Sequence, residues 1–348
     1  MKKIIALLLT LTLLLSLAAC GAVEQTQEIM ENVAVEGELT VEEVPSYPVT
    51  VTDQTGREVT IEEYPETVVS GYYISSSALI ALGQADKLVG IEAKADKRPI
   101  YSLAAPELME LPSVGSAKEF DLEGCIALEP DLVILPQKLK DAAATMEELG
   151  IDVLLVNPEN GELLTEMIWM LGTALDCSTL AEDLISCMEG IAAELDGLLT
   201  DAEAPTVYLA GNSSFLSTAS GGMYQSDLIE QAGGVNVAAE IEDTYWVEVS
   251  HEQILAWDPA YIILASDASY GVEEVYNDAA LAGCAAVENG NVYQLPSDIE
   301  AWDSPVPAGI LGAAWIASIL HPELVTVDLF AEISTDFYET FYGLLYED

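Results

Sequence analysis

Positive charge is scarce in this sequence and ends before its midpoint. The chain has 10 Lys and Arg residues against 60 Asp and Glu residues, and its formal net charge is −50. No Lys or Arg follows Lys140. Because phosphate contacts need cationic side chains, nucleic acid is excluded as a partner. An anionic lipid surface would also repel the folded part of this chain.

Histidine and catalytic motifs are lacking as well. The chain has 2 histidines, His251 and His321, whereas direct binding of zinc or manganese generally needs several. The sequence contains neither a Gly-x-Ser-x-Gly nucleophile elbow nor a His-rich metal motif. We therefore expect no enzyme activity, no cofactor and no site for a bare transition metal. His321 precedes Pro322 at a predicted helix end, so we expect it to be structural.

Cysteine is sparse and irregularly spaced. After Cys20 the chain contains Cys125, Cys177, Cys187 and Cys284. Their spacing fits neither a zinc site nor a disulfide framework. We expect small buried apolar residues, and the sequence leaves open whether any two of them pair.

The N-terminus has the pattern of an export signal. Two lysines precede an apolar run from Ile4 to Ala19, which is too short to span a membrane. The ending Leu-Ala-Ala-Cys-Gly resembles the bacterial lipobox, which implies a signal peptide over residues 1–19 and a lipid on Cys20. The alternative is a plain secretory signal with an incidental cysteine. Residues 20–46 are rich in Glu and nearly free of aromatic residues, which is typical of a disordered acidic tether.

A block of sequence occurs twice further along the chain. Residues 121–135 and 250–264 align without a gap at an offset of 129 residues, and this alignment pairs Glu123 with Glu252. Each block has the pattern of a short helix, a proline stop and a buried strand. The duplication therefore predicts two similar lobes.

One amphipathic segment lies between the two blocks. Apolar residues recur at spacings of three and four from Leu180 to Leu199, and acidic residues occupy the other face. Thr179 and Glu182 have the spacing of a capping box. We predict one helix over residues 178–200 that joins the lobes, in preference to a surface helix of a single large domain.

Strands and helices alternate in both predicted lobes, residues 47–177 and 201–348. The predicted strands are Val49–Thr52, Glu58–Ile61, Thr67–Gly71, Lys87–Ile91, Leu132–Leu135, Val153–Val156, Thr206–Ala210, Tyr261–Leu264 and Val292–Leu295. Predicted helices include Ser75–Leu82, Gln225–Ala232, Ala308–Leu320 and Asp336–Tyr346. Such alternation implies an α/β fold, with two parallel-sheet lobes joined by one long helix and ligands at the carboxyl ends of the strands.

Short segments in a fixed order resemble the periplasmic binding proteins that serve ABC importers of iron complexes and cobalamin, the helical-backbone metal receptors. The resembling stretches are Leu82-Gly83 with Lys87–Gly90, Pro112–Gly115, Leu128–Ile134, Asp227–Val237, Val249–Leu255 and Ala286–Tyr293. The resemblance implies a monomer that holds a small-molecule ligand between its lobes and delivers it to a permease dimer with its ATPase.

The resemblance also gives the duplicated glutamates a role. In that family one glutamate of each lobe docks to the permease, and these positions fall on Glu123 and Glu252. Matched carboxylates suit a partner with two-fold symmetry. The alternative is that both are helix N-terminal carboxylates, favoured by the helix dipole.

Candidate ligand residues follow the predicted strands. Basic residues come after strand ends in the first lobe, namely Lys94, Lys97, Arg98, Lys118 and Lys138. We expect them to favour an anionic ligand, with solvated loop residues as the alternative.

Aromatic residues supply the other candidates for the cleft. They are Tyr72, Tyr73, Tyr224, Tyr245, Trp246, Tyr270 and Trp302, and rings with a polar edge suit a half-wet pocket. Tyr72 and Trp302 are the two that we favour, because they fall at turns where the family lines its cleft.

These features together predict an exported protein, lipid-anchored to the outer face of the cell membrane, that captures a chelated metal such as a ferric siderophore or haem. A corrinoid such as cobalamin is the alternative ligand for the same fold. A surface adhesin lipoprotein without a cleft is the alternative function.

Overall fold

The computed structural model describes residues 47–241 and 245–345. The predicted signal peptide, Cys20 and the acidic tether lie outside these residues. Within the described ranges, no helix combines the length and the apolar composition that a bilayer crossing requires.

A β-hairpin opens the described chain. Strands β1 (Val49–Thr52) and β2 (Glu58–Ile61) pair antiparallel, as predicted. Asp53 in the turn is 3% exposed, and both of its carboxylate oxygens accept hydrogen bonds. One of these oxygens accepts from the guanidinium of Arg57 and from the backbone N–H of Leu155, which fixes the hairpin to the first lobe.

The first lobe is built on a four-stranded parallel sheet with the strand order β4-β3-β7-β8. These strands are β3 (Val68–Ser70), β4 (Leu88–Ile91), β7 (Leu132–Pro136) and β8 (Asp152–Val156). All five residues of β7 are buried, as expected for a central strand with helices on both faces. The predicted strands of this lobe are therefore confirmed to within two residues.

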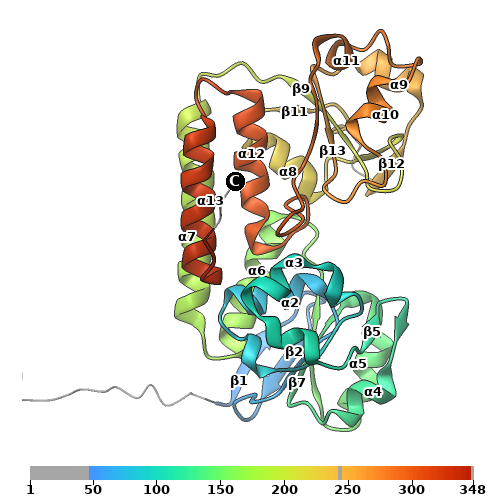
Figure 1. Ribbon diagram of the computed structural model, residues 1–348. Helices are drawn as coiled ribbons and strands as arrows, with labels where there is room; N and C mark the ends of the chain where they lie inside the picture. The colour runs from blue at the N-terminus through green and yellow to red at the C-terminus, as the bar shows by residue number, and fades with distance from the viewer. Residues whose placement is uncertain (1–46, 242–244, 346–348) are drawn as a thin grey trace, which may run out of the picture. The chain divides into compact units, whose positions relative to one another are not determined.

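Helices and short turns of this lobe surround its sheet (Figure 1). The α-helices are α2 (Tyr73–Ala81), α3 (Pro99–Ala104), α4 (Leu122–Ala127), α5 (Lys140–Glu147) and α6 (Gly161–Ala174). The 3-10 turns are η1 (Ala85–Lys87), η2 (Ala95–Lys97), η3 (Pro106–Glu110) and η4 (Gln137–Leu139). Strands β5 (Gly115–Ser116) and β6 (Glu119–Phe120) form a second small hairpin.

The second lobe has a six-stranded sheet in the order β12-β10-β9-β13-β14, with β11 beside β9. Its strands are β9 (Thr206–Ala210), β10 (Ser217–Ala219), β11 (Val235–Asn236), β12 (Trp246–Glu248), β13 (Tyr261–Leu264) and β14 (Val292–Gln294). We expected a purely parallel sheet, but the sheet is mixed. Strand β10 runs antiparallel to both of its neighbours, β9 and β12. The chain turns from β9 into β10 within a few residues, a connection too short for a parallel crossover.

Three helices of the second lobe, α8, α12 and α13, pack against the long connecting helix. The α-helices are α8 (Tyr224–Gln231), α9 (His251–Trp257), α10 (Val272–Tyr276), α11 (Ala285–Asn289), α12 (Ile310–Leu320) and α13 (Val327–Tyr342), and η5 (Pro307–Gly309) precedes α12. Helix α13 begins nine residues before the predicted start, because the Thr326 side chain caps it by accepting from the N–H of Leu329.

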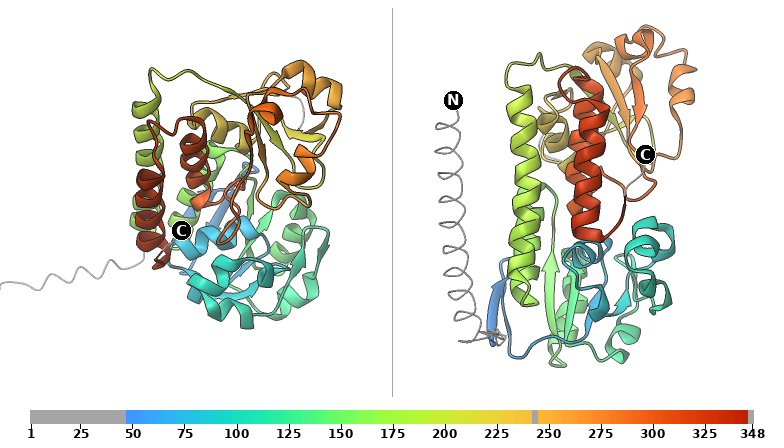
Figure 2. Two further views of the ribbon diagram at one scale, coloured as in Figure 1. Left: turned by 45° about the horizontal axis from the view of Figure 1, so that its top comes forward. Right: turned by 60° about the vertical axis from the view of Figure 1, so that its left-hand side comes forward.

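Helix α7 (Ser178–Leu199) has 22 residues and confirms the helix predicted between the duplicated blocks. It lies along α12 and α13 (Figures 1 and 2). Its buried residues include Ala181, Leu184, Met188 and Leu195, which follow the predicted spacing. The capping box predicted from Thr179 and Glu182 is wrong. The N-cap residue is Cys177, and its side chain makes no capping hydrogen bond to any described residue of the helix.

Candidate ligand-binding site between the lobes

The two lobes meet where strands of both sheets end. Residues after β3 and β4 in the first lobe face the loop that follows β14 in the second. Several hydrogen bonds join the lobes. The N–H of Gly161 donates to Asp227 Oδ2 and the N–H of Tyr224 to Glu159 O, each over 3.0 Å, and three more lie at the loop after β14. Tyr73 Oη donates to Ser304 Oγ over 3.3 Å, Ser77 Oγ donates to Glu300 Oε1 over 2.5 Å, and the N–H of Ile100 donates to Ile299 O over 3.0 Å.

A small cavity lies at this junction. The first lobe lines it with residues that include Tyr73, Lys97 and Arg98, and the second lobe with residues that include Asp267 and Glu300. Its volume is about 30 Å³, far below the roughly 300–1,000 Å³ of a pocket for a drug-sized ligand. As it stands, the cavity cannot hold a ligand of that size.

Arg98 is the cation held most firmly at the cavity. Its guanidinium lies over the ring of Tyr73, 3.9 Å from the ring centroid, and its Nε lies 3.5 Å from Glu92 Oε1. That Nε is buried and makes no hydrogen bond to any residue that the structure describes. A buried N–H without an acceptor marks a place where a bound group can complete the bonding.

A hydrogen-bond network in the first lobe fixes the carboxylate beside Arg98. Glu92 is 5% exposed, and its two oxygens accept from Ser76 Oγ over 2.6 Å and from Tyr101 Oη over 2.8 Å. Burial raises the pKa of Glu92, while the hydrogen bonds from Ser76 and Tyr101 and the charge of Arg98 oppose this rise. The network therefore holds Glu92, and through it the Arg98 side chain, in one place.

Acidic residues of the second lobe face this network. Glu300 is 9% exposed, and burial raises its pKa to about 7. Asp303 is 4% exposed, its pKa is also raised by burial, and it accepts from the N–H of Ser266 over 3.3 Å. Burial therefore disfavours the charged form of both carboxyls.

The structure brings some of the predicted ligand residues together here. Tyr73 and Arg98 line the cavity, and the half-buried Tyr72 meets the Tyr73 ring edge to face, with 5.2 Å between centroids. Burial raises the pKa of both tyrosines, so both remain neutral.

Two predicted cleft residues lie in the core, and for them the prediction is wrong. Trp302 is 1% exposed, packs edge-on against Phe330 and donates its indole N–H to Tyr338 Oη over 2.8 Å. Tyr224 is 4% exposed and begins α8. Both rings fill space between the helices of the second lobe, so neither presents a surface to a ligand.

Other predicted ligand residues lie outside the lining of the cavity. Lys94, Lys118 and Lys138 are exposed on loops or turns after the strands of the first lobe. The expected gathering of basic residues is therefore dispersed, and Arg98 and Lys97 are the members found at the cavity.

The remaining aromatic candidates lie near the end of β9. Tyr270 donates to Gly211 O over 2.6 Å, and the Trp246 ring packs against the same glycine. Tyr245 and Trp246 are 51% and 38% exposed. Contact of these three rings with a ligand stays a prediction.

Several residues at the junction were missed from the sequence. Glu92 directly follows buried strand β4, and three consecutive serines, Ser75 to Ser77, are buried in an otherwise apolar helix. A charged residue at a strand end and a polar run in an apolar helix are signals that could have identified them. Glu300 carries no comparable signal, since it lies in an irregular loop.

The duplicated glutamates occupy equivalent places. Glu123 lies in the first turn of α4 and Glu252 in the first turn of α9, and both are exposed. The preceding residues, Asp121 and Ser250, cap these helices by accepting a backbone N–H. Hydrogen bonds from its own backbone N–H and from Ser250 lower the pKa of Glu252, which fits the helix N-terminal alternative as well as docking.

The cysteines and histidines of the described chain form neither a disulfide nor a metal site. Cys125, Cys177, Cys187 and Cys284 are free thiols. In the part of the chain that the structure describes, no group of three or more His, Cys, Asp or Glu side chains is arranged to hold a metal ion. His321 is buried at the end of α12, and His251 lies 2.9 Å from Asp278.

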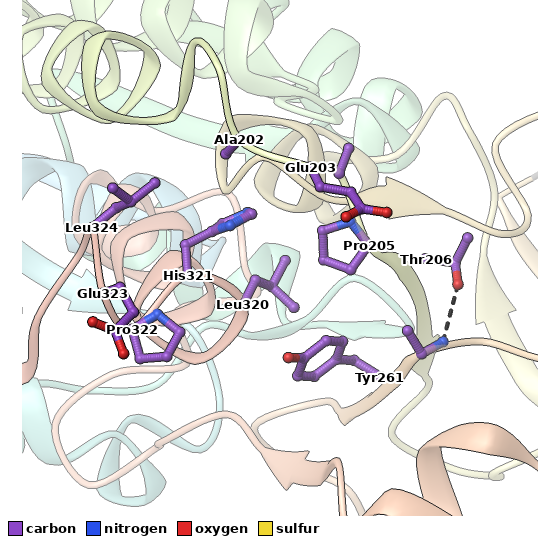
Figure 3. Close-up of a pocket in the computed structure, with 12 residues that line it drawn as sticks. Ala202, Glu203, Pro205, Thr206, Tyr261, Leu320, His321, Pro322, Glu323 and Leu324 are labelled. Carbon is purple, nitrogen blue, oxygen red and sulfur yellow. Dashed lines mark hydrogen bonds between the residues drawn. The ribbon is translucent and has the colours of Figure 1, made fainter.

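A larger hollow lies at the opposite end of the second sheet (Figure 3). Its volume is about 650 Å³, and its lining includes Thr206 and Tyr261 at the starts of β9 and β13, with His321 and Pro322 after α12. Ligands of α/β sheets bind beyond the carboxyl ends of the strands. The position of this hollow at the amino ends therefore argues against a role in solute binding.

Two α/β lobes joined by a long helix, with a polar junction at their strand ends, define a bilobal solute-binding protein. The model of the periplasmic binding protein family matches residues 68–299, and the chain belongs to this family. It is therefore a solute-binding protein of the ABC-transporter type and not an enzyme.

Curated relatives span much of the chain. A molybdate-binding protein of Haemophilus influenzae is 25% identical over 85% of this chain and 92% of its own length. A cobalamin-binding protein of Halobacterium salinarum is 25% identical over 71% of this chain and 66% of its own length. An uncharacterized ABC transporter substrate-binding lipoprotein of Bacillus subtilis is 24% identical, over 80% and 87% of the respective lengths.

Solved structures share the fold. A periplasmic solute binding protein from Veillonella parvula superposes with a TM-score of 0.75 and 27% identity, over 86% of this chain and 94% of that one. The predicted fold of two α/β lobes is confirmed by this likeness and by the two sheets.

Proposed function

We propose that this protein is a lipid-anchored receptor that captures a metal complex between its lobes and delivers it to the permease of an ABC importer. The observation that carries the proposal is Arg98, whose guanidinium is stacked on Tyr73 at the interlobe cavity and whose buried Nε lies 3.5 Å from Glu92 Oε1 without a hydrogen bond to any described residue. Such a group favours a solute that presents an anionic oxygen.

The solutes of the relatives support a metal-bearing solute. The relatives include a molybdate-binding and a cobalamin-binding protein. A ferric siderophore, haem or another iron complex with carboxylate or hydroxamate oxygens fits Arg98. Cobalamin or another corrinoid is the second candidate, and its phosphate and amide groups would meet the same guanidinium.

A binding panel tests the solute class. The purified protein is titrated with ferric hydroxamate, catecholate and carboxylate siderophores, haem, cyanocobalamin and sodium molybdate, and tryptophan fluorescence is followed. Saturable binding of one metal complex, weakened by Arg98→Gln, is the expected result. Absence of binding across the whole panel would favour a non-transport surface protein, and molybdate binding alone would replace the chelate with a bare oxyanion.

The lipid anchor is proposed from the sequence. Leu-Ala-Ala-Cys-Gly at residues 17–21 carries it, and the Bacillus subtilis relative bears the name lipoprotein. Cys20→Ser should move the protein from the membrane fraction to the soluble fraction and abolish incorporation of labelled palmitate. If the Cys20→Ser variant stays in the membrane fraction, Cys20 does not carry the lipid anchor.

Glu123 and Glu252 are proposed as the docking contacts for the two permease subunits. Their exposure and their matched places in α4 and α9 support this assignment. The net charge of −50 favours association with a basic surface.

A further inference from the structure

Glu300 connects the two lobes through the interior of the junction. It lies in the loop after β14, and its Oε1 accepts from Ser77 Oγ on α2 of the other lobe. Its Oε2 is buried and makes no hydrogen bond within the described part of the chain. One carboxyl oxygen therefore accepts a hydrogen bond across the lobes, while the other is shielded from water next to the Tyr342 hydroxyl, which favours the ionised form.

Two further contacts flank this carboxyl. Ile100 N–H donates to Ile299 O, and Tyr73 Oη donates to Ser304 Oγ. We call these two bonds, together with Ser77 to Glu300, the interlobe clasp. Separation of the lobes would break all three bonds and expose the Glu300 carboxyl to water.

The groups that face Glu300 only partly compensate the negative charge that its carboxyl carries when ionised. Arg98 of the first lobe favours the ionised form, but this guanidinium is already shared with Glu92. The hydroxyls of Ser77 and of the buried Tyr342 also favour the ionised form, but burial outweighs these contributions, and Tyr224 of α8 interacts with the carboxyl as well.

The cavity adds charges of both signs near Glu300. Lys97 and Asp267 line it from opposite lobes, and Asp303 lies three residues further along the same loop. A buried carboxylate whose nearest cation is shared with another acid is destabilised relative to the neutral acid, because burial disfavours the charged form.

We propose that Glu300 is a proton-operated clasp, which holds the lobes together over the solute site as a neutral acid and loosens them when it ionises. Solute retention by the receptor would then be linked to protonation. This consequence rests on the proposed function, whereas the separation of the lobes can be measured without any solute.

The direction of the pH effect follows from burial. The pKa of Glu300 rises from 4.5 to about 7 because the carboxyl is buried. The joined lobes thus hold a proton that the separated lobes release between these two values. The clasp is favoured at low pH, weakens as the pH rises toward about 7, and changes little above it.

Distances between spin labels in the solute-free protein test the clasp. Labels are placed on exposed positions of the two lobes, Glu119→Cys and Asn212→Cys. Cys20→Ser removes the proposed lipid site, and Cys187→Ser removes the thiol that is only partly buried. The ratio of separated to joined lobes should rise about tenfold per pH unit between pH 5 and 7 and level off above pH 7, since one proton is exchanged.

Two variants identify the titrating group. Glu300→Gln keeps the acceptor for Ser77 but cannot ionise, so it should lose the tenfold response while the lobes stay joined. Asp152→Asn is the matched control, because burial also raises the pKa of Asp152 but this residue lies in β8 of the first lobe. Its response should equal that of the parent protein.

Ser77→Ala is a second test, which is needed if Glu300→Gln does not fold. It removes the donor without removing the titrating group, so more molecules should be separated at every pH while the pH response is kept. An unchanged response in Glu300→Gln, or lobes that stay joined from pH 5 to 8 in the parent protein, would overturn the proposal. Failure of solute binding in the panel described above would overturn the proposed function alone.

Discussion

Glu129 and Asp258 lie 129 residues apart and adopt the same left-handed backbone conformation, with φ of 50° and 47°. In each lobe the N–H two residues later donates to a threonine hydroxyl at the start of the neighbouring strand, Thr67 or Thr206. A non-glycine residue rarely adopts this conformation. The duplication therefore extends to backbone geometry, and it places α4 and α9 equivalently before the central strands β7 and β13.

Docking to the permease should depend on the glutamate of each lobe. Glu123→Ala with Glu252→Ala should abolish uptake of the solute in cells while the dissociation constant of the purified protein stays within about twofold. Removal of one carboxylate should weaken the receptor–permease complex by roughly 2–5 kcal/mol if its partner cation is desolvated on docking. Uptake of labelled solute and co-purification with the permease measure the two effects.

Exposed acids elsewhere on each lobe provide the control for docking. Glu148→Ala with Glu273→Ala removes the same charge from exposed positions of the two lobes. If this control takes up solute normally while Glu123→Ala with Glu252→Ala does not, the loss of uptake is due to the positions of the two glutamates. Equal loss in both would point to net charge, and normal uptake by the first pair would leave the glutamates as helix N-terminal carboxylates.

Solute affinity should depend on the shape of the Arg98 side chain as well as its charge. Lysine cannot reproduce the stack on Tyr73 or the planar set of donors, so Arg98→Lys should weaken binding by about 1–2 kcal/mol, roughly 5- to 30-fold. Arg98→Gln should cost more, about 2–3 kcal/mol, because a charge-assisted hydrogen bond is lost.

Lys140→Gln is the matched control, since this exposed cation lies in α5 away from the cavity lining. Fluorescence titration of the solute found in the panel measures all three variants. Equal affinity of the parent protein and Arg98→Gln would exclude the guanidinium from the site.

The limits of the sequence can be seen in particular residues. The spacing of Leu184, Met188 and Leu195 predicts α7 because helix periodicity is written locally in the chain. Trp302 was misplaced and Glu300 was missed, because both lie in an irregular loop whose course depends on packing between distant helices. Arg98 was predicted as a ligand residue from its position after a strand, but its contacts with Glu92 and Tyr73 depend on how the chain folds back on itself.

Stability in acid should depend on Asp53, which holds the first hairpin. Burial tends to raise the pKa of Asp53, but hydrogen bonds from Arg57 and Thr55 outweigh it and hold the pKa below 3.8. The carboxylate therefore stabilises the fold above pH 3.8, and this contribution is lost as the pH falls through the lowered pKa. Asp53→Asn should destabilise by roughly 3–5 kcal/mol at pH 7, because Arg57 loses its buried partner, and should flatten the acid limb of the unfolding profile.

Urea unfolding between pH 3 and 7 measures this effect. Glu147→Gln is the comparison, since Glu147 bonds to the same guanidinium over 2.6 Å but has a side chain that is 39% exposed. That change should cost no more than about 1 kcal/mol. Similar losses in both variants would show that Arg57 and not the buried carboxylate governs the hairpin.

Trp302 should matter for stability and not for solute binding. Its indole N–H donates to Tyr338 Oη in the core, and the ring is 1% exposed. Trp302→Phe keeps most of the apolar packing but leaves the buried hydroxyl with one donor fewer, so it should destabilise by about 1–3 kcal/mol and leave the dissociation constant within about twofold. A similar change at the exposed Trp169 should have little effect on stability, since that ring is 48% exposed. Chemical unfolding and solute titration on the same preparations separate the two roles, because a tryptophan that touched the solute would lower affinity by more than the folded fraction falls.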